Sequence, residues 1–128
     1  TPRLPPKWRL PPASVPRSVA IEYAGLLSRF VSALYTRNEA EALAGLRDVM
    51  AEPHRLALMP ELSGLRSQFM AAGIPHLGIS GSGPTLFAVC TGDEQSQTAA
   101  ALFRSSYEKN SDAMTHICRV AEHGARAL

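Results

Sequence analysis

The chain has little of what marks several large classes of protein. It has two cysteines, Cys90 and Cys118, with neither a metal-ligand spacing nor a Cys-x-x-Cys partner. A disulfide framework or zinc site is therefore not indicated, and buried, reduced thiols are expected. The formal net charge is only +2, and the 13 lysines and arginines are scattered without interleaved aromatic residues. We therefore expect no nucleic-acid partner.

Long apolar runs and catalytic clusters are also missing. No apolar stretch approaches the roughly 20 residues of a membrane span, and the first residues hold prolines where a signal peptide has an apolar core. We expect no membrane partner and a cytoplasmic location. The four histidines have no metal-binding spacing and no carboxylate cluster beside them, so no metal site is predicted. No serine has a recognisable His and Asp pair, which leaves hydrolase chemistry without support.

What the chain does have is the composition of one globular domain. With 128 residues, 45% of them hydrophobic, it can form a single core. Residues 1–16 hold six of the ten prolines and are predicted to form an extended arm. Residues 17–128 are predicted to form the domain.

Apolar spacing by three and four residues predicts four helices. They are expected over Arg17–Tyr35, from about Asn38 to Met50, from Pro60 to a C-cap at Gly73, and over about Glu94–Tyr107. The apolar stripes of the first and last helices are interpreted as core faces. Asn38 is predicted to cap the second helix and Pro53 to end it, while Asp93 is predicted to cap the fourth.

Three strands complete the pattern, over Leu77–Ser80, Thr85–Thr91 and Met114–Val120. Helices followed by two strands, a helix and a strand predict an α+β fold. Its small antiparallel sheet would be covered by helices on one face.

A glycine-rich segment, Gly78-Ile79-Ser80-Gly81-Ser82-Gly83-Pro84-Thr85, lies between the first two predicted strands. Glycine allows a positive φ and lets a ligand approach without meeting a Cβ. Serine hydroxyls and consecutive free N–H groups can hold an anionic oxygen. The segment therefore predicts a cradle for a charged small molecule, and an ordinary hairpin turn is the alternative.

A second candidate lies upstream in Glu52-Pro53-His54-Arg55. Because the proline is expected to end a helix, Arg55 is predicted to lie in a loop where its guanidinium can turn toward a ligand. The planar guanidinium matches a carboxylate with two parallel hydrogen bonds. The alternative is a solvated surface arginine. Glu52 is expected to pair with Arg55 or to cap a neighbouring turn.

Three motifs in order resemble those of the GHMP kinases, small-molecule kinases whose glycine-rich loops are not Walker A loops, and among them the homoserine kinases. Ala51–Arg55 with Leu58-Met59-Pro60 is similar to their EPxR…LxP signature. Gly78–Ala88 is similar to their GISGSGPTxFA run. Thr115–Arg119 followed by Gly124–Arg126 resembles their last strand and tail. Three ordered motifs are far more specific than one glycine-rich loop.

The resemblance implies a ferredoxin-like C-terminal domain of a kinase that transfers the γ-phosphoryl group of ATP to L-homoserine, in threonine biosynthesis. It implies that Arg55 binds the substrate α-carboxylate. The floor beneath the substrate and the phosphoryl group would be formed by Gly78, Ser80, Gly81, Ser82 and Gly83, with Gly81 also binding substrate. No residue of the chain is assigned a catalytic role.

The chain also departs from the family. A complete kinase is more than twice as long, and nothing here matches its nucleotide loop, Pro-x-x-x-Gly-Leu-Gly-Ser-Ser. We therefore expect a C-terminal fragment that is inactive alone and forms a homo-oligomer. ATP and Mg²⁺ would be bound mainly by the missing N-terminal domain.

Two other hypotheses stay open. One is another GHMP kinase acting on a different small alcohol, such as mevalonate or a sugar. Arg55 argues against it, because a guanidinium suits an amino-acid carboxylate. The other is a free-standing ligand-binding or regulatory domain of ferredoxin-like fold. The length of the native open reading frame would separate these hypotheses.

Overall fold

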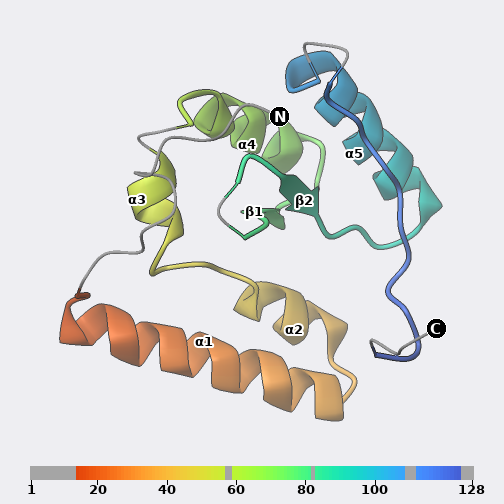
Figure 1. Cartoon of the computed structure of the whole chain (residues 1–128). Helices are drawn as coiled ribbons and strands as arrows, with labels where there is room; N and C mark the ends of the chain where they lie inside the picture. The colour runs from red at the N-terminus through yellow and green to blue at the C-terminus, as the bar shows by residue number, and fades with distance from the viewer. Residues whose placement is uncertain (1–13, 57–58, 82, 109–111, 125–128) are drawn as a thin grey trace.

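The computed structural model describes residues 14–56, 59–81, 83–108 and 112–124. Most of the predicted arm, residues 1–13, lies outside them. Helices come first along the chain, followed by a two-stranded hairpin and a last helix (Figure 1). The elements are α1 (Arg17–Tyr35), α2 (Glu39–Gly45), α3 (Glu52–Leu56), α4 (Glu61–Ala71), β1 (Leu77–Ile79), β2 (Leu86–Ala88) and α5 (Asp93–Ser106).

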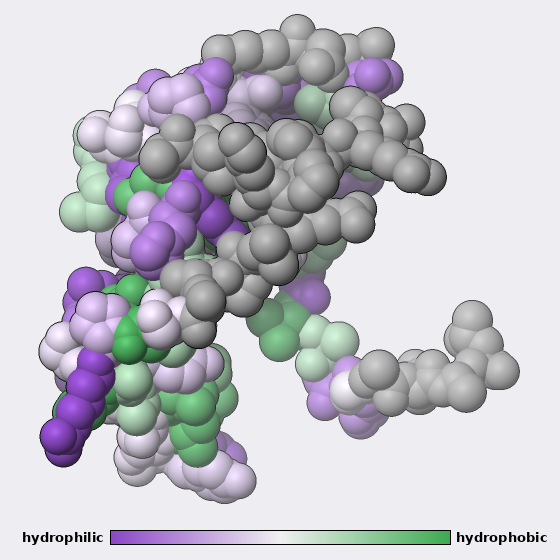
Figure 2. Space-filling model, turned by 60° about the vertical axis from the view of Figure 1, so that its left-hand side comes forward, coloured by the Kyte–Doolittle hydropathy of each residue, from purple (hydrophilic) through white to green (hydrophobic). Residues whose placement is uncertain are grey.

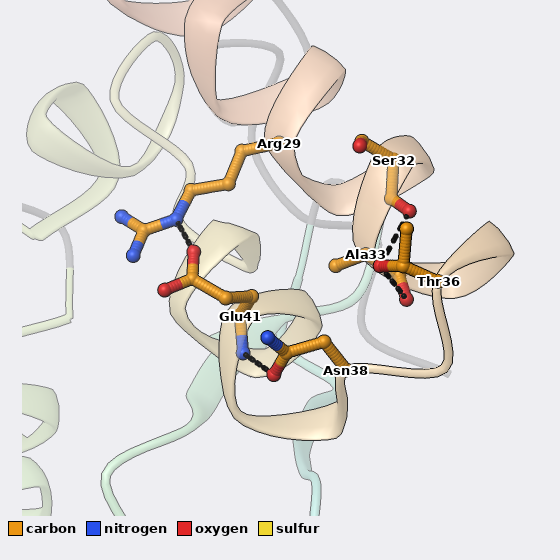
Figure 3. Close-up of polar contacts among 6 residues, drawn as sticks. All are labelled: Arg29, Ser32, Ala33, Thr36, Asn38 and Glu41. Atoms are coloured by element: carbon orange, nitrogen blue, oxygen red, sulfur yellow. Dashed lines mark hydrogen bonds and ion pairs between the residues drawn. The ribbon is translucent and has the colours of Figure 1, made fainter.

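Helices α1 and α2 form a hairpin whose turn is held by polar side chains (Figure 3). The side-chain oxygen of Asn38 accepts a hydrogen bond from the N–H of Glu41 at 3.2 Å, which confirms the predicted cap. The carboxylate of Glu41 forms an ion pair with Arg29 of α1. Gly45 allows the two helices to approach closely, since a Cβ there would lie 3.0 Å from the Cβ of Phe30.

The second helix is shorter than predicted and is followed by a separate one. It ends at Gly45, not near Met50. The Asp48 carboxylate then accepts hydrogen bonds from the N–H groups of Met50 (3.0 Å) and Ala51 (2.7 Å), and α3 begins at Glu52. Pro53 lies in the first turn of α3, where a proline costs no intrahelical hydrogen bond.

Helix α4 supplies the centre of the hydrophobic core. Its buried side chains, at steps of three and four, are Leu62, Leu65 and Phe69. Gly73, with φ +73°, closes the helix: its N–H donates to Met70 O at 3.0 Å, and the Ile74 N–H donates to Phe69 O at 2.8 Å. These two bonds form a Schellman motif, so the predicted C-cap at Gly73 is confirmed. The buried Ile74 then leads toward β1.

The hairpin β1–β2 is antiparallel, with Leu77 opposite Ala88 and Ile79 opposite Leu86. Side chains of these four residues pack with the core residues of α4 and α5. On the other face the Phe87 ring covers Gly78, where a Cβ would lie 2.7 Å from a ring carbon. The predicted α+β fold, a small antiparallel sheet with helices on one face, is confirmed, although β2 is shorter than the Thr85–Thr91 expected.

The end of the chain differs from the prediction in two places. Asp93 is the first residue of α5 and makes no capping hydrogen bond, because Gly92 occupies the N-cap position. Met114–Val120, predicted as a strand, is irregular. It lines one side of a groove of about 870 Å³ whose other sides are β2 and α5. Alternating apolar residues form a strand only when a neighbouring edge lies within bonding distance.

The apolar stripe of α1 is only partly buried, which corrects its interpretation as a core face. Leu26 and Phe30 are half-buried, whereas the exposed fractions of Tyr23, Leu27 and Leu34 are 42%, 49% and 55%. Figure 2 shows hydrophobic surface on the lower part of the molecule, over this hairpin. Among the described residues, no helix combines the length and the hydropathy of a membrane span.

Candidate functional site

The segment between β1 and β2 is a tight loop closed by its own backbone. The N–H of Ser80 donates to Thr85 O at 2.8 Å, and the N–H of Gly83 donates to Ser80 O at 3.1 Å. Gly81 and Gly83 have φ values of +58° and +77°, a region that other residues rarely adopt. The loop therefore uses the backbone freedom that the sequence predicted.

The closing bonds decide which loop amides can meet a ligand. Those of Ser80 and Gly83 are occupied within the loop, whereas within the described part of the chain the Gly81 N–H has no hydrogen-bond partner. Nothing lies within 4 Å of the position of a Cβ on Gly81, so this side of the loop is open. Gly78 lies in β1 beneath Phe87. Ser82 falls outside the described residues.

The loop rests on the core through Gly83. A Cβ there would lie 3.6 Å from the Ile79 side chain and 3.8 Å from the Met59 sulfur. Met59 is 5% exposed and belongs to the core cluster. Because Met59 joins α3 to α4, the loop touches the chain that follows Arg55 by four residues.

Arg55 lies on α3, not in a loop as predicted, because Pro53 begins that helix instead of ending the preceding one. Its side chain is half-buried, and it forms no ion pair or hydrogen bond with any described residue. Glu52 pairs with Arg66 of α4 at 2.5 Å, not with Arg55 as one hypothesis had it. Among the described residues, no side chain therefore occupies the guanidinium of Arg55.

Tyr107 is a loop contact that the sequence analysis did not identify. Its hydroxyl donates a hydrogen bond to Pro84 O at 2.6 Å. Burial and, to a lesser extent, the Glu61 carboxylate raise the pKa of Tyr107, so at neutral pH the hydroxyl is protonated and can donate. Apolar periodicity predicts a core face on the helix expected to end at about Tyr107, but periodicity does not specify where a hydroxyl points.

The surroundings of the cysteines and histidines do not favour metal binding or nucleophilic catalysis. Burial raises the pKa of the Cys90 thiol, which keeps it protonated. Cys118 is exposed, so the expectation of two buried thiols is wrong for it. His54 and His116 are exposed. No group of three or more His, Cys, Asp or Glu that could hold a metal ion occurs within the described ranges.

Comparison with known proteins gives two findings. The family model described as GHMP kinases C terminal matches residues 30–109. In overall structure the chain is similar to the crystal structure of homoserine kinase from Cytophaga hutchinsonii, with a TM-score of 0.69 and 26% sequence identity. That match covers 77% of this chain and 31% of the kinase. The chain therefore spans about a third of the length of its structural relative.

Proposed function

The chain belongs to the GHMP kinase C-terminal family, and we propose that it is the substrate-binding domain of an ATP-dependent homoserine kinase of threonine biosynthesis. In the proposed reaction the hydroxyl oxygen of L-homoserine attacks the γ-phosphorus of ATP. The bond from that phosphorus to the β–γ bridging oxygen breaks, ADP leaves, and the hydroxyl proton is released. Such a reaction depends on positioning the two substrates and on neutralising the negative charge of the phosphoryl group. The proposal places the enzyme in the cytoplasm.

The surroundings of Arg55 are the observation that supports L-homoserine as the substrate. Arg55 is a half-buried residue whose guanidinium has no ion-pair partner among the described residues, which leaves its positive charge open to pairing with an anionic ligand. A carboxylate offers the two oxygens that the guanidinium geometry fits. L-homoserine has both this carboxylate and a primary alcohol for phosphorylation.

The glycine-rich loop supports the proposed position of the reacting hydroxyl of the substrate. The open Gly81 side lets a substrate approach the backbone, and the Gly81 N–H, which has no partner among the described residues, can donate to an anionic oxygen. Met59 links this loop to the segment after Arg55. The carboxylate of the amino acid would therefore be bound from α3 and its reacting end would lie over the loop.

The described residues of this chain include neither a ligand cluster for Mg²⁺ nor a lysine for the ATP phosphates. The loop has no lysine after it, and the described ranges contain no cluster of His, Cys, Asp or Glu suited to a metal. Magnesium is bound in kinases through carboxylates and substrate phosphates. We therefore propose that both are bound mainly by the remainder of a longer kinase.

Replacement of Arg55 by lysine in the full-length kinase tests the proposal. Lysine keeps the charge but loses the two parallel hydrogen bonds, so the Michaelis constant for L-homoserine should rise about 10- to 100-fold, equivalent to about 1.5–3 kcal/mol. The constant for ATP should change less than about twofold, since the substitution leaves positive charge in place. Arg104→Lys, an exposed arginine of α5, is the matched control and should alter neither.

Three outcomes would count against this assignment. An unchanged homoserine constant in Arg55→Lys would make Arg55 a solvated side chain. Equal increases in the Michaelis constants for homoserine and ATP would show that Arg55 does not act specifically on the substrate carboxylate. Phosphorylation of mevalonate or a sugar, but not of homoserine, by the wild-type kinase would favour the other GHMP kinase hypothesis.

A further inference from the structure

The glycine-rich loop is held from outside by one described side chain. The Tyr107 hydroxyl donates to Pro84 O at 2.6 Å, across 23 residues of sequence. Among the described residues, no other side chain forms a hydrogen bond to residues 80–85. The remaining bonds of the loop join its own residues to each other.

Tyr107 is itself firmly placed. It occupies the C-cap position of α5, where its N–H donates to Phe103 O at 2.8 Å. Its half-buried ring packs against the core cluster. The preceding turn is fixed by Phe103, whose ring lies 4.8 Å from that of Phe69. The packing of the ring against the core therefore sets the position of the hydroxyl that contacts the loop.

The bond to Pro84 fixes the exit of the loop at the point where its backbone turns. Pro84 follows Gly83, whose N–H closes the loop on Ser80 and where a Cβ would lie 3.8 Å from the Met59 sulfur. Without the tyrosine hydroxyl, the Pro84 carbonyl would lose its protein partner. The loop would then keep its own two closing bonds, but it would be joined to the rest of the fold only through the hairpin and apolar contacts, which do not fix the direction of its exit.

We propose that Tyr107 is a positioning residue for phosphoryl transfer: its hydroxyl fixes the loop in the shape against which the acceptor alcohol is presented. The inference rests on the proposed function of the loop. It predicts that loss of the hydroxyl lowers turnover more than it weakens ATP binding, because a misplacement of reacting groups by about 1 Å can lower the rate of the chemical step by up to 100-fold.

The first test is Tyr107→Phe in the full-length kinase, with Tyr35→Phe as the matched control because the Tyr35 side chain lies on α1 and is 87% exposed. Tyr107→Phe keeps the packed ring, so the melting temperature should stay within about 5 °C of wild type. We expect kcat to fall about tenfold while the Michaelis constant for ATP changes less than twofold. Tyr35→Phe should match wild type in all three quantities.

The second test does not depend on activity. The amides of Ser80 and Gly83 are hydrogen-bonded within the loop, so hydrogen–deuterium exchange of a peptide spanning the loop reports whether its shape is held. Exchange should become several-fold faster in Tyr107→Phe and stay unchanged in Tyr35→Phe. Peptides of α4 should exchange as in wild type, which excludes general loosening of the core.

The outcomes separate this inference from the function on which it rests. A wild-type kinase that does not phosphorylate homoserine overturns the proposed function, while the exchange experiment still decides the role of Tyr107. Unchanged loop exchange, or unchanged kcat in an active kinase, overturns the positioning role. A kcat loss matched by a large fall in melting temperature and faster exchange in α4 would show a purely structural residue, and also overturns it.

Discussion

Gly81 and Gly83 share a left-handed backbone conformation but differ in their surroundings. Gly83 lies close to Ile79 and Met59, so a side chain there would meet both the backbone restriction and its neighbours. Gly81 has φ +58° and open space around it. A substitution at Gly81 therefore tests the backbone conformation alone.

Gly81→Ala should destabilise the protein by about 1 kcal/mol, the usual cost of a left-handed conformation for a residue with a Cβ, and should lower kinase turnover. Gly64→Ala is its counterpart, because Gly64 lies within α4 with nothing near its Cβ position and no positive φ. It should stabilise by about 0.5–1 kcal/mol, since alanine favours helices. Thermal melts should therefore shift in opposite directions. If both variants melted above wild type, the left-handed loop conformation would be wrong.

At the scale of residues, the glycine-rich loop could be identified from the sequence, but the side chain that holds it in place could not. Glycine and proline report on backbone conformation, so the positive φ angles of the loop were predictable from Gly81 and Gly83. The Tyr107 contact was not, because it joins residues far apart in sequence through one hydroxyl. The roles assigned to Arg55 and to the loop glycines remain predictions.

At the scale of elements, the chain that leads into α3 is held by the Asp48 carboxylate. Asp48 accepts hydrogen bonds from two backbone N–H groups immediately before the helix, and α3 has only five residues. A helix this short is not stable by its own propensity. The orientation of Arg55 is therefore linked to Asp48.

Asp48→Ala should weaken homoserine binding several-fold and destabilise the protein by about 1 kcal/mol, as for the loss of a helix cap. Asp48→Asn keeps the accepting oxygen and should retain most of both properties, which makes it the matched control. Titration of the full-length kinase with L-homoserine would measure the effect. Equal binding by wild type and Asp48→Ala would show that the position of α3 does not matter for the substrate.

The long elements were predictable and the short ones were not. Apolar periodicity gave α1, α4 and α5 nearly to their ends, because three or more turns repeat the same signal. Helix α3 has too few residues for a period, and Pro53 was interpreted as an end when it marks a beginning. Met114–Val120 alternates like a strand, but a strand also needs a partner edge, which a local pattern cannot supply.

At the scale of the whole molecule, the outer edge of β2 is open. Thr85 and Val89 bond toward β1, so by alternation the backbone groups of Leu86 and Ala88 point to the opposite edge. No described strand pairs there, and the groove lined by residues 112–120 lies beside it. Open strand edges favour pairing with another chain.

We therefore expect the chain, studied alone, to self-associate as its concentration rises, as light scattering would measure. Ala88→Pro removes an N–H from the open edge while leaving the bonds toward β1, so it should reduce association. Circular dichroism should confirm that the variant stays folded. A wild-type chain that stays monomeric at high concentration would contradict the expectation of a homo-oligomer.

The bond from Tyr107 to Pro84 also bears on how the loop is coupled to the core. Its two residues are separated by β2 and α5 along the chain, so this contact costs more chain entropy to form than the local bonds that close the loop. The position of the loop exit at Pro84 therefore depends on the packing of α5 against the core. If the loop binds substrate as proposed, substrate affinity is then coupled to the stability of the core. Substitutions at Phe69 or Leu62 that loosen the core, without approaching the loop, should lower the fraction of molecules able to bind.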